Sequence, residues 1–203
     1  MTLFLMVMIY LNDRVDQLDI EDALSRVSPQ RREQALRFCF ESGRRLCLAA
    51  YLLLMDGLRE EYGLDEPPVF DYSPEGKPFI LTHPDIHFSF SHSGNVALCA
   101  VCDRPVGADV EVPRKISPSL IRYTMNEDEQ IRINSSENPT MQFLHFWTRK
   151  EALLKLTAEG IRNDMKAVLA EADKYQIETV QTEKYIFSVA TFQNIPEKHH
   201  SRE

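Results

Sequence analysis

Two carboxylates separated by one residue stand in an otherwise apolar stretch of the sequence. Asp109 and Glu111 alternate with Ala108 and Val110, and residues two positions apart in a β-strand point to the same face of the sheet. Two like charges held close together repel each other, and a hard cation that takes both as oxygen ligands relieves the repulsion. The pattern therefore indicates a candidate divalent metal site, and the alternative is an edge strand whose carboxylates face solvent.

A second candidate group lies in residues 146–155, which have the pattern of a helix. Trp147, Glu151 and Lys155 recur every four residues and so share one helix face. That face offers an acid and a base. The alternative is a surface Glu–Lys pair that contributes about 0.3–0.5 kcal/mol beside a buried tryptophan.

Two further segments are typical of anion sites. Residues 88–94 form a strand that ends in serines, His92 and a glycine turn, and hydroxyl, imidazole and backbone N–H groups all donate to phosphate oxygens. Residues 29–45 hold five arginines and only two glutamates, in a chain whose net charge is −8. The alternatives are a hairpin end that His92 caps and a solvated helix face.

The composition indicates a soluble globular protein: 203 residues, 43% apolar and 27% charged. The excess of acidic residues argues against broad binding to nucleic acid or to an anionic membrane. The apolar stretch 3–11 is far shorter than the ~20 residues that span a bilayer, and it lacks the flanks of a secretion signal. We therefore expect a first β-strand there, a cytoplasmic protein, and free thiols at the four cysteines, with Cys99 and Cys102 in the core.

The remaining pattern predicts helices and short strands in an order that occurs twice. Predicted helices cover residues 28–41, 43–62 with Gly63 as its end, and 140–157. Predicted strands cover residues 69–72, 78–81, 86–91, 96–102, 106–112, 175–180 and 185–192, with a hairpin turn at 93–95. This predicts an α+β fold of two pseudo-duplicated halves, each a helix packed on a small, mainly antiparallel sheet, over residues 1–104 and 105–195, followed by a tail at 196–203.

Four motifs in this order resemble those of the 4′-phosphopantetheinyl transferases, specifically the long, pseudo-duplicated Sfp-type branch. They are Gly76-Lys77-Pro78, residues 88–93, residues 107–111 and residues 147–152. The resemblance covers about residues 29–161. It implies transfer of the 4′-phosphopantetheine group from coenzyme A to a serine hydroxyl of an apo acyl or peptidyl carrier protein, with release of adenosine 3′,5′-bisphosphate.

The resemblance also implies roles for individual residues. Asp109, Glu111 and Glu151 match the acidic triad around Mg²⁺, for which Mn²⁺ is a substitute, and Glu151 is the favoured base. Lys155 matches the lysine that meets the pyrophosphate and stabilises the departing phosphate. The residues that match coenzyme A contacts are Arg31, Arg45, Lys77, Pro78, Ser91, His92 and Lys155. Glu129 aligns loosely with a further acidic position.

Two positions depart from the family pattern. Ala158 stands where the family has a glycine after the helix, which indicates a differently shaped loop, and Gln34 occupies an often basic position, which indicates a weaker hold on the 3′-phosphate.

Two alternative functions stay open. The first uses the same carboxylates for metal-assisted hydrolysis of a phosphoester by water. The second is a binding module without turnover, for which Ala158 is the motive. Because the two halves can form the cleft within one chain, we expect a monomer.

Overall fold

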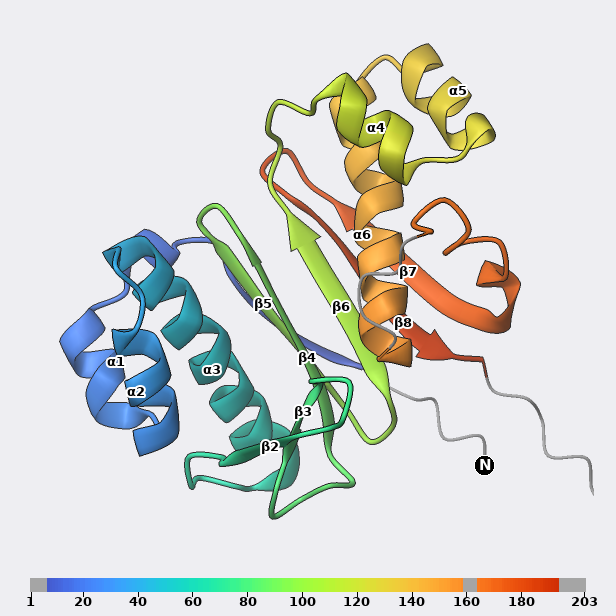
Figure 1. Cartoon of the computed structure of the whole chain (residues 1–203). Coiled ribbons are helices and arrows are strands. Elements are labelled where there is room, and N and C mark those ends of the chain that lie inside the picture. Colours follow the sequence, from blue (N-terminus) through green and yellow to red (C-terminus); the bar gives the residue numbers. More distant parts are fainter. Residues whose placement is uncertain (1–6, 159–163, 194–203) are drawn as a thin grey trace, which may run out of the picture.

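The computed structural model describes residues 7–158 and 164–193, and the elements divide between two halves (Figure 1). The elements of the first half are β1 (Met8–Asn12), α1 (Ile20–Arg26), α2 (Pro29–Leu36), α3 (Glu41–Tyr62), β2 (Phe70–Tyr72), β3 (Pro78–Ile80), β4 (His87–Ser93) and β5 (Val96–Cys102). Those of the second half are β6 (Val106–Glu111), α4 (Pro118–Thr124), α5 (Glu127–Ser135), α6 (Pro139–Thr157), β7 (Tyr175–Gln181) and β8 (Ile186–Phe192). Short 3-10 turns cover Val15–Gln17 and Ala172–Lys174.

Each half contains a three-stranded antiparallel sheet against which one long helix packs. The strand order is β1-β5-β4 in the sheet of the first half and β6-β8-β7 in that of the second. In each of these sheets the strand that comes last in the chain therefore lies between the other two. In both halves the helices come between the first and second strands of the sheet. The predicted α+β class is confirmed, and the duplication stays a prediction that this shared order supports.

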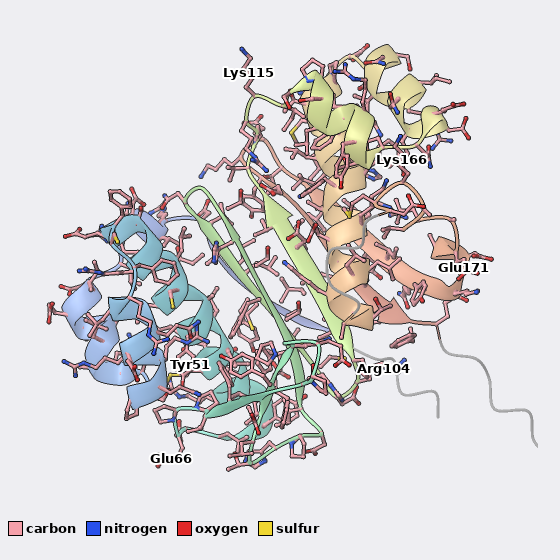
Figure 2. All side chains as sticks on the ribbon, in the orientation of Figure 1. Tyr51, Glu66, Arg104, Lys115, Lys166 and Glu171 are labelled. Carbon is pink, nitrogen blue, oxygen red and sulfur yellow. The ribbon has the colours of Figure 1, made fainter. Side chains whose placement is uncertain are left out.

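The core of the first half lies between α3 and the sheet. Leu48, Tyr51, Leu54 and Leu58 recur at helical spacing and are fully or almost fully buried. Tyr51, labelled on α3 in Figure 2, is fully buried and donates its hydroxyl hydrogen to the carbonyl of Pro68 at 2.5 Å. A buried tyrosine therefore keeps its polar end satisfied.

The predicted helix over residues 28–41 was wrong at its C-terminal end. Ser28 caps α2, as predicted, by accepting from the N–H of Arg31. The helix then stops at Leu36, and α3 begins at Glu41. Phe38 and Phe40 are 41% and 78% exposed. Residues 36, 38 and 40 alternate with a period of two, so they form no continuous helical face that could bury them.

Helix α1 was not predicted, whereas several local signals were correct. Asp19 caps α1 by accepting from the N–H groups of Glu21 and Asp22. Gly63 ends α3 in the left-handed conformation, as predicted. Cys99 and Cys102 are buried in β5, as predicted for core cysteines. Among the described residues, none of the helices combines the length and apolar character needed to cross a bilayer.

Helix α6 ends at Thr157 and is capped by Ala158, whose φ of 59° and ψ of 20° lie in the left-handed region. In that region Cβ of an L-residue crowds the following carbonyl at a cost of about 1–2 kcal/mol, which glycine avoids. We therefore expect Ala158→Gly to raise the free energy of unfolding by about 1 kcal/mol. Urea denaturation measures the change. Ala152→Gly, in the right-handed interior of the same helix, is the control and should lower stability by about 1 kcal/mol. Destabilisation by Ala158→Gly would contradict this description of the helix end.

Candidate active site

The two halves meet where β4 and β6 lie side by side (Figure 1). Within residues 7–158 and 164–193, strand β6 pairs with β8 on one edge only. Three serines of β4 accept hydrogen bonds from alternate backbone N–H groups along its other edge and just beyond its end. These N–H groups belong to Ala108, Val110 and Val112, which donate to Ser89, Ser91 and Ser93 over 2.9, 3.1 and 3.4 Å. We call these three pairs the serine seam. It joins the two sheets through side chains instead of a backbone ladder.

Two lysines satisfy carbonyl groups along the same edge. Lys77 Nζ donates to the carbonyl of Val106 at 3.2 Å and to that of Leu156 at 3.4 Å. Lys155 Nζ donates to the carbonyl of Ala108 at 3.0 Å and to that of Phe90 at 3.3 Å. Burial lowers the pKa of Lys77. Both lysines therefore connect elements that are distant in the sequence.

Asp109 and Glu111 each bind a serine of the seam. Asp109 is 6% exposed, and its Oδ1 accepts from Ser91 Oγ and from Lys155 Nζ, both at 2.8 Å. Its Oδ2 is buried and has no partner among the described residues. Glu111 Oε2 accepts from Ser93 Oγ at 2.6 Å, and its Oε1 accepts from the exposed Arg114 at 3.2 Å.

Glu151 projects from α6 and completes the acidic group. Burial raises the pKa of its carboxyl group, and so does repulsion from Asp109 and from Glu111, while Lys155 opposes the shift. Its Oε1 is buried and has no hydrogen-bond partner within the described part of the chain. The structure thus places Lys155 and the three predicted carboxylates close enough for Asp109, Glu111 and Lys155 to affect the charge of Glu151.

The donor chemistry of this group suits a hard divalent cation. Carboxylate oxygens are the ligands that Mg²⁺ prefers. Two of them, Asp109 Oδ2 and Glu151 Oε1, are buried and have no hydrogen-bond partner among the residues that the structure describes. Across residues 7–158 and 164–193, no three His, Cys, Asp or Glu side chains are already arranged as a complete set of metal ligands. The residues therefore fit a cation by type and by their unsatisfied oxygens.

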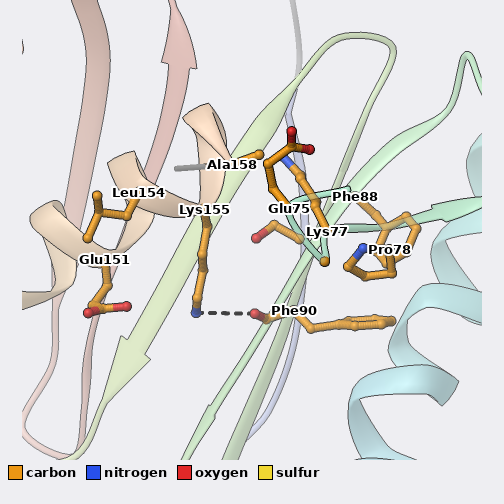
Figure 3. Close-up of a pocket in the computed structure, with 11 residues that line it drawn as sticks. Glu75, Lys77, Pro78, Phe88, Phe90, Glu151, Leu154, Lys155 and Ala158 are labelled. Carbon is orange, nitrogen blue, oxygen red and sulfur yellow. Dashed lines mark hydrogen bonds between the residues drawn. The ribbon is translucent and has the colours of Figure 1, made fainter. Parts of the chain in front are cut away.

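A cavity of about 340 Å³ lies beside this group, between the Gly76-Lys77-Pro78 turn, β4 and the C-terminal end of α6 (Figure 3). Phe88 and Phe90 line its apolar side. Four predicted site residues also line it, namely Lys77, Pro78, Glu151 and Lys155. Figure 3 shows Lys155 reaching across the gap toward the carbonyl of Phe90. The cavity thus combines a cationic side and an acidic group with an apolar wall.

The other predicted coenzyme contacts do not line the cavity. Arg31 is 7% exposed, and its guanidinium lies over the rings of three aromatic residues. Its distances to the ring centroids are 4.9 Å for Tyr51, 5.2 Å for Phe70 and 5.6 Å for Phe90. Arg45 donates to the carbonyl of Leu18 and pairs with Glu41 at 3.0 Å. His92 is exposed next to Ser91, beside the seam.

Lys150, for which no role was predicted, is fully buried. Its ammonium group donates to Glu129 Oε2 at 2.6 Å and to the carbonyls of Thr124 and Met165 at 2.8 and 2.9 Å. These three bonds hold the end of α4, the start of α5 and the chain after α6 around one helix position. Glu129 therefore has a structural partner and also closes the capping box of α5 with Asn126. A lysine between buried positions of α6 was the available signal for this buried pair.

Known proteins similar to this chain share the family indicated by the motifs. The profile of the 4′-phosphopantetheinyl transferase superfamily matches residues 105–200. The 4′-phosphopantetheinyl transferase Sfp of Bacillus subtilis is 30% identical over 156 residues, which cover 75% of this chain and 70% of Sfp. The 4′-phosphopantetheinyl transferase psf-1 of Bacillus pumilus is 32% identical over 163 residues, or 79% of this chain and 70% of psf-1. HetI of Nostoc sp., also a 4′-phosphopantetheinyl transferase, is 34% identical over 151 residues, or 70% and 64%. Sfp and psf-1 are each at least 30% identical to this chain and are matched over 70% of their length. The chain therefore belongs to the 4′-phosphopantetheinyl transferase superfamily and, within it, to the Sfp-type branch.

Proposed function

We propose that this chain transfers the 4′-phosphopantetheine group from coenzyme A to a serine hydroxyl of an apo carrier protein and releases adenosine 3′,5′-bisphosphate. The relatives support the reaction type, because they are named for it. The structural observation that carries the proposal is the cavity in which Glu151 and Lys155 meet Lys77, next to Asp109. It offers a base, cations for phosphate and an apolar wall within reach of one another.

Coenzyme A has chemistry that matches the parts of this cavity. The ammonium groups of Lys77 and Lys155 suit its pyrophosphate, and the wall of Phe88 and Phe90 suits the less polar arm. We propose Arg45, Ser91 and His92 as contacts of the nucleotide and its phosphates. Arg31 suits this role least, because an anion would have to reach a guanidinium enclosed by three aromatic rings.

We propose Mg²⁺, with Mn²⁺ as a substitute, as the cation held by Asp109, Glu111 and Glu151. Two of these three side chains have a buried oxygen that no other described residue binds, and oxygen ligands suit both ions. When bound, the cation would neutralise charge on the pyrophosphate under attack.

The side chains of this chain can handle the proton and the leaving group. As the serine oxygen of the carrier forms a bond to phosphorus, Glu151 accepts the hydroxyl proton. The bond from phosphorus to the oxygen of the departing adenosine 3′,5′-bisphosphate breaks, and Lys155 stabilises the charge on that oxygen. Burial of Glu151 fits this role, because a raised pKa makes its carboxylate a stronger base.

The test is to incubate the full chain with coenzyme A, Mg²⁺ and a panel of apo acyl, peptidyl and aryl carrier proteins, and to measure intact masses. We expect at least one carrier to gain the mass of one phosphopantetheine arm. Release of adenosine 3′,5′-bisphosphate at an equal rate without any carrier would instead identify hydrolysis. Tight binding of coenzyme A without transfer to any carrier would identify a binding module.

We further propose that the chain is a monomer acting in the cytoplasm. Both sides of the cavity come from one chain, since its walls lie on β4 of the first half and α6 of the second. A second copy is therefore not needed to complete the site. Light scattering coupled to gel filtration measures the mass in solution, and a stable dimer would contradict the monomer.

Asp109→Ala should weaken the binding of Mg²⁺ and of coenzyme A together. The substitution removes a proposed metal ligand and frees Lys155 from its 2.8 Å partner, so we expect Mg²⁺ affinity to fall about 10-fold or more. Raised Mg²⁺ should partly restore transfer. Calorimetric titrations measure both affinities, with Asp128→Ala, an exposed aspartate of α5, as the unchanged control. Normal affinities in Asp109→Ala would exclude Asp109 as a ligand.

A further inference from the structure

The three serines of the seam all accept a backbone N–H group, but they differ in whether they also donate to a carboxylate. Each accepts one N–H group of the edge of β6. Ser91 and Ser93 also donate to Asp109 and Glu111 over 2.8 and 2.6 Å. Within the described part of the chain, Ser89 binds the N–H group and no carboxylate. The chain therefore contains its own comparison between a seam serine with a carboxylate partner and one without.

The chemistry of a hydroxyl explains why the two contacts occur together. A serine hydroxyl has one hydrogen to donate and lone pairs with which to accept. When Ser93 Oγ accepts the N–H of Val112, its single hydrogen remains free for Glu111. A hydrogen bond to an ionised carboxylate is stronger than one between neutral groups. Each of these serines therefore fixes one oxygen of a carboxylate relative to the strand that carries it.

We propose that Ser93 and Ser91 are positioning residues for the divalent cation, which they serve by holding Glu111 and Asp109. This inference rests on the proposed function, because it takes these carboxylates as metal ligands. Ser91 holds Oδ1 of Asp109 together with Lys155, and Oδ2 has no partner in the described part of the chain. Ser93 holds Oε2 of Glu111, and Oε1 pairs with Arg114, whose side chain is 52% exposed and therefore a weak competitor. Each carboxylate thus keeps one oxygen available for a ligand.

Ser93→Ala is the main test, because Ser91 is also a proposed coenzyme contact. The full chain is titrated with Mg²⁺ by calorimetry in the absence of coenzyme A, and the Mg²⁺-dependent shift of the melting temperature is recorded in parallel. Loss of a hydrogen bond to a metal ligand lowers metal affinity about 10- to 100-fold, and we expect this for Ser93→Ala. Ser93→Thr returns a hydroxyl to the same Cβ and should restore the affinity.

Ser89→Ala is the matched control. It removes a backbone acceptor of the same kind and no carboxylate contact, so it should lower the melting temperature without changing Mg²⁺ affinity. Ser91→Ala, measured in the same titration without coenzyme A, is the second variant and should weaken Mg²⁺ binding through Asp109.

The inference is overturned if Ser93→Ala binds Mg²⁺ as tightly as the unaltered chain, if Ser89→Ala weakens binding equally, or if the unaltered chain binds no divalent cation. Failure of the proposed function has a different signature. In that case no carrier gains mass, whereas the contrast between Ser93→Ala and Ser89→Ala in the metal titration persists.

Discussion

Glu151→Gln is expected to lower turnover about 100-fold or more while coenzyme A binding stays near normal. Glutamine keeps the shape of the side chain and one ligand oxygen, but it cannot accept the proton of the carrier serine. Single-turnover mass spectrometry at saturating Mg²⁺ measures the transfer step, and calorimetry measures coenzyme A affinity. Glu127→Gln, on the exposed first turn of α5, is the control and should behave like the unaltered chain.

Near-normal turnover of Glu151→Gln would show that Glu151 is not the base. A water molecule or a phosphate of the coenzyme would then have to take the proton. If coenzyme A affinity is lost together with turnover, Glu151 contributes to coenzyme A binding, and the loss of turnover is then not evidence for proton transfer.

The same variant has a second readout in stability. Because burial and the neighbouring Asp109 raise the pKa of Glu151, the folded state binds this proton more tightly than the unfolded state does. The stability that the proton provides is fully present below the ordinary pKa and is lost as the pH rises through the raised value. Without metal, Glu151→Gln should therefore melt at a higher temperature than the unaltered chain at neutral pH. Thermal melts from pH 4 to 8 should show this difference shrinking toward acid pH.

Gly107→Ala is expected to destabilise the fold by about 3 kcal/mol or more and to abolish transfer. A Cβ at this position of β6 would overlap the carbonyl oxygen of Ala152 and the backbone nitrogen of Leu156. Backbone atoms cannot rotate away as a side chain can, so α6 would have to move off β6. Glu151 and Lys155 would move with it, away from Asp109.

Urea denaturation and the carrier assay together test the role of Gly107. Gly43→Ala is the matched control, because the three atoms nearest to its new Cβ, at 2.7–3.4 Å, all belong to the side chain of Phe38. That side chain is 41% exposed and has room to shift, and alanine favours the helix that Gly43 occupies. If Gly107→Ala unfolds at the same urea concentration as the unaltered chain, the close packing of α6 on β6 described above is wrong.

Local sequence signals predicted many elements of the fold. Strand β5 spans Val96–Cys102, the bounds that the apolar run predicted, and Gly63 ends α3 at the expected residue. Such features depend on neighbours in the chain, so a single sequence contains them. The end of α2 was predicted wrongly, although the period of two in residues 36, 38 and 40 already disfavours one continuous helix face.

The candidate site was predictable in part. The shared face of Asp109 and Glu111 follows from strand geometry alone, whereas the approach of Glu151 from α6 came only from the family resemblance. The serines of residues 88–94 were interpreted as phosphate donors, which stays a proposal for Ser91. Their hydrogen bonds to the N–H groups of Ala108, Val110 and Val112 were not predicted. The position of β6 beside β4 is a tertiary feature that local patterns do not encode. The same reason applies to Arg31, whose aromatic neighbours are distant in the sequence.

The serine seam also bears on aggregation. A strand with unpaired N–H and C=O groups along one side can recruit strands of other molecules. Along this side of β6, the hydroxyls of Ser89 and Ser91 accept from backbone N–H groups, and the ammonium groups of Lys77 and Lys155 donate to backbone C=O groups. Three of these four partners, Lys77, Ser89 and Ser91, belong to the first half. A second half released from the first would expose this edge to strand addition, so the first half protects its neighbour from self-association.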